Sequence, residues 1–246
     1  MDCRTGQLSG GRSYYGYQAG ILCLPSAIPR PVGDPGNAQT FDFPVLHEVV
    51  EGVSFRQILD RDHAALPHII DAANKLETKG VRFILSTCGL YAPLQRAIAA
   101  RLSVPFIGSA LHAVPFLHSL LPADQRIGVL TGHAGLLCDE HVVPSGFRLA
   151  DVCVHGMEDY PEFRRVVLEG AQDMDFERMQ RDATSAASAL TKACEGIGML
   201  VLECPNLVPF RASIQAATGL PVYDIVSLAG LIASGFSTRD CAARCR

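Results

Sequence analysis

The sequence of 246 residues lacks the signatures of several large protein classes. Its formal net charge is −4 and its Lys and Arg residues are scattered, which argues against a nucleic-acid partner. No apolar run approaches the ~18 residues that a membrane helix needs, and the polar N-terminal stretch has no apolar segment of the kind that signal peptides contain. We therefore expect a cytoplasmic protein that binds a small molecule and has neither a nucleic-acid nor a membrane partner.

Cofactor motifs are also missing. No G-x-G-x-x-G follows an expected strand, no P-loop is present, and the histidines lack the H-E-x-x-H spacing of a zinc site. Pyridoxal enzymes need a lysine for the Schiff base. The chain has only Lys75, Lys79 and Lys192, each expected near the C-terminal end of a helix, where a cation favours solvent. We expect no cofactor and no metal.

Cysteine is well represented, with nine residues in a chain that is 48% hydrophobic. A chain of this size can bury one large core or two modest ones, so it does not need disulfides for stability. We interpret the cysteines as reduced thiols. Cys23, Cys153 and Cys194 fit the role of core residues, because cysteine is among the most buried residue types.

The most informative feature is an internal repeat. The segment 81–113 aligns without a gap on 197–229, and Cys204 lies 116 positions after Cys88. Prolines recur in the same register, with Pro93 matching Pro209. In each copy an apolar run ends at the cysteine and is followed by a helix-period segment and a second short apolar run, which predicts strand, turn, helix and strand.

The repeat predicts an α/β fold of two pseudo-symmetric parallel-sheet lobes related by internal duplication, with the active site in the cleft between them. Parallel sheets bind ligands beyond the carboxyl ends of their strands, which is where both cysteines are expected. We assign residues 17–118 to lobe 1, completed by the C-terminal residues 222–246, and residues 119–221 to lobe 2. Further strands are expected at 17–24, 126–132 and 150–155, and helices at 62–78, 176–195 and 225–236.

The segment from Pro25 to Asn37 contains four prolines and two glycines in thirteen residues. Such a density of proline excludes a helix or a central strand. Because the segment follows the first expected strand, we expect an ordered loop over the cleft that influences the choice of substrate.

Cys88 and Cys204 each precede an expected helix, whose first N–H groups and positive dipole end should lower a thiol pKa from about 8.5 toward neutrality. A thiol of that kind can accept or donate a proton at neutral pH. The alternative is that both cysteines are core residues, but their matched positions in two copies of one unit favour a chemical role.

Three motifs carry a family resemblance: Ser86-Thr87-Cys88-Gly89, Gly128-Val129-Leu130-Thr131-Gly132 and Glu203-Cys204-Pro205-Asn206. With them the chain resembles the cofactor-independent aspartate/glutamate racemase superfamily, which includes hydantoin racemases, maleate isomerases and arylmalonate decarboxylases. The resemblance implies two lobes that contribute one catalytic cysteine each, here Cys88 and Cys204, on opposite faces of the substrate. Because a decarboxylase needs only one thiol, the pair favours racemisation or isomerisation.

Other polar residues at the expected strand ends are candidates for the site. Hydroxyl, amide and N–H groups there suit a substrate carboxylate, although Ser and Thr at such positions also cap helices and an Asn in a Gly-Asn turn also serves as a turn former. Glu203 and His133 are candidates for tuning the site, and Arg30 for holding a second carboxylate. The candidate substrate-binding residues are Ser86, Thr87, Gly89, Leu90, Asn37, Thr131 and Asn206.

We therefore expect a racemase or epimerase that inverts the α-carbon of an amino acid or related carboxylate by two-base proton transfer between cysteines. One alternative is a cis–trans isomerase of the maleate type, in which one cysteine acts as a nucleophile. A second is a two-lobed binding protein without catalysis. Homo-oligomerisation stays open, because the sequence does not determine the oligomeric state.

Overall fold

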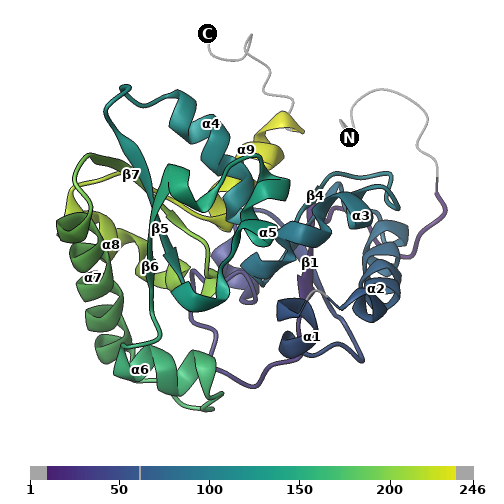
Figure 1. The fold of residues 1–246 in the computed structure, drawn as a ribbon. Coiled ribbons are helices and arrows are strands. Elements are labelled where there is room, and N and C mark those ends of the chain that lie inside the picture. Colours follow the sequence, from purple (N-terminus) through teal and green to yellow (C-terminus); the bar gives the residue numbers. More distant parts are fainter. Residues whose placement is uncertain (1–9, 61, 237–246) are drawn as a thin grey trace, which may run out of the picture.

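Residues 10–60 and 62–236 are described in the computed structural model of the protein, and they form two four-stranded parallel sheets flanked by helices (Figure 1). The two sheets have equivalent strand orders, β2-β1-β3-β4 and β6-β5-β7-β8. The expected α/β fold with two parallel-sheet lobes is confirmed. The strands of the first sheet are β1 (Ala19–Cys23), β2 (Val45–Val49), β3 (Phe83–Ser86) and β4 (Phe106–Ile107). Those of the second are β5 (Arg126–Thr131), β6 (Val152–Gly156), β7 (Ile197–Leu202) and β8 (Val222–Tyr223).

The internal repeat reappears in the secondary structure. A 3-10 helix begins directly after each of the two matched cysteines, η3 (Gly89–Leu94) in the first copy and η9 (Pro205–Phe210) in the second. Each leads into an α-helix, α3 (Gln95–Ala99) or α8 (Arg211–Thr218), and then into β4 or β8. The two copies therefore place their cysteines at the same point of the same unit.

Helices cover the sheets in the manner that their apolar spacing predicts. In α2 (Leu66–Thr78) the buried residues Ile69, Ala73 and Leu76 follow one face of the helix, and the helix contacts β1 and β2. On the second sheet α7 (Phe176–Ala193) contacts β5 and β6, beside α8 in Figure 1. The last helix, α9 (Ile225–Gly235), returns to contact β3 of the first sheet.

The remaining helical segments are short. The α-helices are α1 (Phe55–Leu59), α4 (Val114–Ser119), α5 (Asp139–Val142) and α6 (Pro161–Phe163). The 3-10 helices are η1 (Ala38–Thr40), η2 (His63–Ala65), η4 (Ala110–Ala113), η5 (Ala134–Leu136), η6 (Val143–Ser145) and η7 (Leu149–Asp151), and η8 (Arg164–Leu168) is a π-helical turn.

The two sheets share part of one core. The larger cluster of buried side chains contains the interior of the first sheet together with Ile127, Val129 and Val201 of the second. The alternate residues Leu130, Leu200 and Leu202 belong to a separate cluster with the buried face of α7, as the two-residue period of a strand requires. One face of the second sheet therefore packs toward the first lobe and the other toward its own helices.

One strand and one lobe boundary differ from the sequence-based expectation. The strand β2 is absent from that expectation, because its residues are only partly buried and its apolar pattern is weak. The short strand β8 pairs with β7, so the second sheet extends past residue 221, the expected end of lobe 2. The division of the chain into lobes at these residues stays a prediction, and residues 237–246 of the expected C-terminal contribution lie outside the described part.

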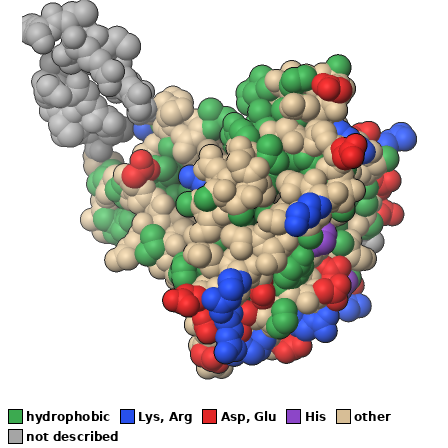
Figure 2. Space-filling model, turned by 90° about the vertical axis from the view of Figure 1, so that its left-hand side faces the viewer, with side chains coloured by type: hydrophobic (Ala, Val, Ile, Leu, Met, Phe, Trp, Pro, Cys, Tyr) green, Lys and Arg blue, Asp and Glu red, His purple; other side chains and the backbone are tan. Residues whose placement is uncertain are grey.

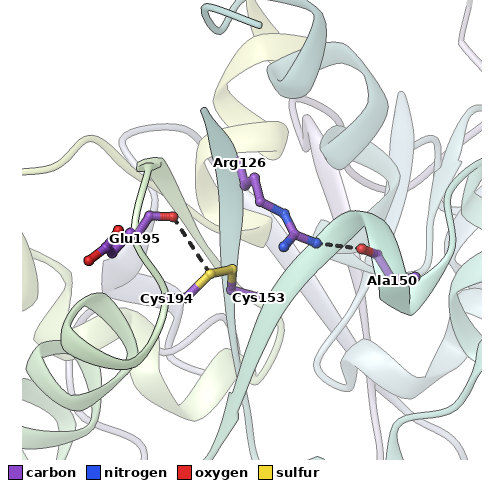
Figure 3. Close-up of a disulfide and its surroundings, with 5 residues drawn as sticks. All are labelled: Arg126, Ala150, Cys153, Cys194 and Glu195. Atoms are coloured by element: carbon purple, nitrogen blue, oxygen red, sulfur yellow. Dashed lines mark hydrogen bonds between the residues drawn. A yellow bond between two sulfur atoms is a disulfide. The ribbon is translucent and has the colours of Figure 1, made fainter. Parts of the chain in front are cut away.

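The expectation that all the cysteines are reduced thiols is wrong. Cys153 of β6 and Cys194, which follows α7, form a disulfide (Figure 3). The contact between β6 and α7 brings the Cα atoms of Cys153 and Cys194 to within 6.4 Å of each other, which is in the range that a disulfide spans. Sequence spacing alone does not reveal this proximity. Three other cysteines, Cys3, Cys241 and Cys245, lie outside the described residues.

The described residues contain no helix that is both long and apolar enough to cross a membrane. On the face seen in Figure 2, side chains of Lys and Arg lie among those of Asp and Glu, with no large area of one sign. This agrees with the scattered charges of the sequence.

Candidate functional site

A cavity of about 320 Å³ lies where the ends of the two sheets meet, and both Cys88 and Cys204 line it. Cys88 follows β3 and Cys204 follows β7, so the equivalent strands of the two sheets each deliver one thiol. Both cysteines are buried, at 9% and 8% exposure. Two thiols from two lobes therefore border one small chamber.

The turn at Cys88 is held from behind by Ser86. The Ser86 hydroxyl lies 2.8 Å from both the Cys88 and the Gly108 carbonyl oxygens, and it accepts a hydrogen bond from the Cys88 N–H. Burial, and after it the negative charge of Glu203, raise the pKa of the Cys88 thiol to about 12. A hydrogen bond from the Leu90 N–H and the positive charge of Arg30 act in the opposite direction.

Cys204 lies in a similar but not identical setting. Its pKa is raised well above the ordinary value, first by burial and then by the negative charge of Glu203, while a hydrogen bond from the Asn206 N–H opposes the shift. The expectation that helix N-termini would bring both thiol pKa values toward neutrality is wrong. The helices after the cysteines are short 3-10 segments, and the loss of hydration outweighs their N–H groups.

Glu203 is a buried acid that acts on both thiols. It is 3% exposed, and its carboxyl group accepts hydrogen bonds from the Thr131 hydroxyl, at 2.8 Å, and from the Gly132 N–H. Burial raises the Glu203 pKa to about 7, although these hydrogen bonds lower it. A carboxyl group that titrates near neutral pH therefore stands beside both thiols and raises the pKa of each when it is ionised.

The proline-rich loop reaches across to the second lobe. A β-carbon on Gly33, whose φ is +109°, would lie 2.6 Å from the Cα atom of Pro209, so the two lobes touch here. The Asp34 carboxylate accepts hydrogen bonds from the Arg30 guanidinium at 2.9 Å and from the Asn206 side-chain amide at 3.0 Å. In Figure 1 the purple trace that contains this loop runs from the first sheet toward the second along the lower edge.

The rest of the cavity wall is mostly apolar. One cation, the Arg30 guanidinium, lines the same space as the two thiols and Glu203. This composition suits a small ligand that carries one carboxylate and an apolar group. The apolar lining residues are Leu24, Pro25, Ile28, Phe55, Leu90, Leu136, Val167, Leu168 and Pro205.

Most of the residues singled out from the sequence border this cavity: Cys88, Cys204, Thr87, Gly89, Leu90, Thr131, Asn206, Glu203 and His133. Ser86 and Asn37 do not. Ser86 is engaged with main-chain groups, and Asn37 caps η1 and donates from its side-chain amide to the Arg30 carbonyl oxygen. Both support the backbone around the cavity, so their expected role as direct substrate ligands has no geometric support.

Asp34 and Phe55 are functional candidates that sequence reasoning misses, because no motif marks either residue and each reaches the site only through the tertiary fold. Within the described residues, no group of three or more His, Cys, Asp and Glu side chains is arranged to hold a metal ion.

Comparison with known proteins assigns the chain to a family. The family model described as Asp/Glu/Hydantoin racemase matches residues 45–230. Among solved structures, unliganded arylmalonate decarboxylase superposes with a TM-score of 0.59 at 15% identity, covering 90% of this chain and 94% of the other. Allantoin racemase from Klebsiella pneumoniae gives a TM-score of 0.55 at 14% identity, covering 90% of each chain. At these identities the likeness shows the fold alone.

Curated relatives add a different reaction name. A dimethylsulfoniopropionate lyase of Durusdinium sp. clade D is 28% identical over 216 residues, which cover 85% of this chain and 71% of that protein. Dimethylsulfoniopropionate lyase 6 of Emiliania huxleyi is 26% identical over 220 residues, and the chain spans only 57% of its length. The proteins similar to this chain thus include racemases, a decarboxylase and lyases. Because the matched model covers most of the sequence, the chain belongs to the Asp/Glu/Hydantoin racemase family.

Proposed function

We propose that this protein is a cofactor-independent lyase that removes a proton from the carbon next to a carboxylate, with a cysteine as the base, and expels a leaving group from the neighbouring carbon. The proposed substrate is dimethylsulfoniopropionate or a close analogue. The supporting observation is one cavity in which two thiols, one buried acid and one guanidinium meet against an apolar wall. The curated relatives named for this reaction support the same choice.

The chemistry balances without a co-reactant. A thiolate takes the proton from the carbon next to the carboxylate, the electrons of that C–H bond form a C=C bond, and the C–S bond breaks with its electrons leaving on dimethyl sulfide. The products are dimethyl sulfide, acrylate and a thiol that returns its proton to solvent. Arg30 is the group that we propose for the substrate carboxylate, because it is the guanidinium that lines the cavity.

The positive charge of the proposed substrate opposes the effects that raise the pKa values of both thiols. In the empty cavity both thiols stay protonated at neutral pH, because burial and the Glu203 carboxylate oppose the thiolate. A sulfonium cation in the same cavity offsets the charge of Glu203 and favours the thiolate. The apolar side chains around it suit the two methyl groups. Binding of the substrate should therefore favour formation of the thiolate base.

Racemisation of an amino acid or related carboxylate, the function expected from the sequence, is the second candidate. One specific observation favours it, namely that each lobe brings a thiol to the cavity. Both candidates share the first step, proton removal next to a carboxylate. They differ in the second step, because a racemase returns a proton to the same carbon and a lyase expels a leaving group. Isomerisation of the maleate type has no separate observation in its favour. The cytoplasmic location of the protein stays a prediction.

One experiment separates these reactions. The purified protein is incubated in heavy water with dimethylsulfoniopropionate, with a panel of L-amino acids and hydantoins, and with maleate, and the mixtures are followed by proton NMR together with headspace detection of dimethyl sulfide. We expect dimethyl sulfide and acrylate in equal amounts, and none with a Cys88→Ala variant. Deuteration next to the carboxylate of an amino acid without elimination would establish racemisation instead and contradict the lyase proposal.

A further inference from the structure

The two thiols differ in one respect that the internal repeat does not predict. The Sγ atom of Cys204 lies 3.6 Å from the side-chain oxygen Oδ1 of Asn206, in the geometry of an S–H group that donates to an amide oxygen. Both thiols accept a hydrogen bond from the main-chain N–H two residues further on, that of Leu90 for Cys88 and that of Asn206 for Cys204, so the side-chain acceptor at Cys204 is what sets the two sites apart. An acceptor facing sulfur favours the thiol, and a donor facing sulfur favours the thiolate.

The orientation of the Asn206 amide depends on the opposite lobe. Its nitrogen Nδ2 donates to Oδ2 of Asp34 at 3.0 Å. A carboxylate is an acceptor only, so the NH₂ group must face Asp34 and the oxygen must face Cys204. If the amide turned over, two oxygens would face each other and the sulfur would gain a donor.

Asp34 is itself firmly held. It is 1% exposed, and its other oxygen accepts hydrogen bonds from the Arg30 guanidinium at 2.9 Å and from the Gly36 N–H at 2.7 Å. These contacts fix the carboxylate within the proline-rich loop. Because the contacts lie in lobe 1 and Cys204 lies in lobe 2, the arrangement exists only when the loop spans the cleft.

We propose that Asp34 is a positioning residue that holds the Asn206 amide oxygen toward Cys204, so that Cys204 stays a neutral thiol and Cys88 serves as the base. The charges around the two thiols agree with this assignment. Arg30 favours ionisation of Cys88, whereas Asp34 opposes ionisation of Cys204. The assignment of roles deepens the proposed function and rests on it, but the state of Cys204 can be measured without turnover.

The assignment also bears on the type of reaction. A racemase that works in both directions needs each thiol to act as base in turn, whereas an elimination needs one base only. An amide locked with its oxygen toward one thiol gives the two cysteines unequal roles. This asymmetry fits elimination better than racemisation.

The test is the pH dependence of alkylation of each thiol by iodoacetamide, read for Cys88 and Cys204 separately by peptide mass spectrometry. The midpoint of each profile reports the pKa of that thiol, while the plateau rate at high pH reports how easily the reagent reaches it. The charged and titratable groups that influence Cys204 are Glu203, Cys88 and Asp34, with Arg30 and His133 lining the same cavity. All but Asp34 are unchanged in the central variant.

In Asp34→Asn the amide at position 34 can donate, so Asn206 can turn its NH₂ group toward sulfur, and the negative charge of Asp34 that opposes ionisation of Cys204 is lost as well. Asn206→Leu, which keeps the Asp34 charge, separates the two effects. We expect the Cys204 midpoint to move to lower pH, with alkylation at a fixed pH below it rising by about tenfold or more, the effect of a hydrogen bond to an ionised group. The matched control is Asp60→Asn, which removes an exposed carboxylate paired with Arg56 at 2.7 Å outside the cavity. It should leave both midpoints unchanged.

A swapped pair gives the rescue. In Asp34→Asn/Asn206→Asp an acceptor again faces Cys204, and its midpoint should return to the original value or higher. If Asp34→Asn does not fold, all buried thiols react together and the ratio of Cys204 to Cys88 labelling approaches one. The test then uses Asn206→Leu. Because this variant lacks the amide oxygen, its Cys204 midpoint must also be lower than that of the wild type. An unchanged Cys204 midpoint in a folded Asp34→Asn protein, or no return in the swapped pair, overturns the proposal. Absence of lyase activity alone contradicts only the proposed reaction.

Discussion

The carboxyl group of Glu203, in the second lobe, lies directly against Gly89 of the first, at a point where a β-carbon would overlap both the Oε1 atom and the main-chain oxygen of Glu203. Gly89 follows Cys88, and Glu203 precedes Cys204. The residues flanking the two thiols are therefore packed against each other across the lobes. This contact fixes the acid next to both thiols, and it requires glycine at position 89 for space and not for backbone conformation.

Gly89→Ala should displace Glu203 and separate the lobes slightly. We expect a loss of about 1–3 kcal/mol in the free energy of unfolding, as for other overpacked sites, together with a large loss of turnover. The measurement is urea denaturation beside an activity assay. Gly230→Ala in α9 is the control, because its β-carbon meets no atom within 4 Å, and it should keep or raise stability by about 1 kcal/mol. Equal stability of the two variants would show that the contact at Gly89 is unimportant.

Removing the charge of Glu203 should make both thiols more acidic. Glu203→Gln keeps the shape of the side chain and an oxygen for Thr131 and Gly132, but it removes the negative charge that raises the pKa values of Cys88 and Cys204. We expect faster alkylation of both thiols at pH 8 and a shift of the alkylation midpoints to lower pH. Because Glu203 acts on both thiols, a change confined to one of them would contradict this account of its role.

The raised pKa of Glu203 predicts a specific pH dependence of stability. The group is raised from 4.5 to about 7 in the folded protein, so between these values the unfolded state releases the proton first. The contribution of Glu203 to stability therefore falls as pH rises from about 4.5 to about 7 and is constant above. The measurable quantity is the difference in unfolding free energy between wild type and Glu203→Gln across this range. A difference that does not vary with pH would mean that Glu203 titrates near its ordinary value.

The two cysteines should respond differently to substitution. For an elimination with Cys88 as base, Cys88→Ser should reduce dimethyl sulfide formation by about 10²–10⁴-fold, the usual contribution of a general base, whereas Cys204→Ser should retain measurable elimination. For a racemase, both variants should lose turnover, with exchange of the α-proton remaining for one enantiomer. Full activity in both variants would support the interpretation of the cysteines as core residues.

The disulfide between Cys153 and Cys194 should contribute to stability because it closes a segment with a sequence separation of 41 residues. Loop-closure entropy for that length predicts about 4 kcal/mol. A reducing agent should therefore lower the urea midpoint of the wild type and leave a Cys153→Ser/Cys194→Ser variant unaffected. Intact-protein mass spectrometry with and without reduction checks that the bond is present. If reduction changes neither the mass nor the midpoint, the bond does not form in solution.

Much of the architecture is predictable from the chain itself. The repeat that relates Cys88 to Cys204 is a property of local sequence, because each copy has its own apolar strand, its own turn and its own proline register. These local features predict the paired sheets, the position of each thiol at a strand end and the return of α9 to the first lobe. The weak strand β2 and the disulfide escape such reasoning, since partly buried edges and distant partners leave little trace in local periodicity.

The properties of the site were decided by the tertiary structure. The sequence indicates helix starts after both cysteines and hence acidic thiols, but burial in a shared cavity reverses the direction of both pKa shifts. The contacts of Glu203 with Gly89 and of Asp34 with Asn206 join residues that are far apart in the chain. A residue type and its local spacing determine which strand or turn a side chain belongs to, whereas its hydration, its charge neighbours and its hydrogen-bond partners depend on which segments the fold brings together.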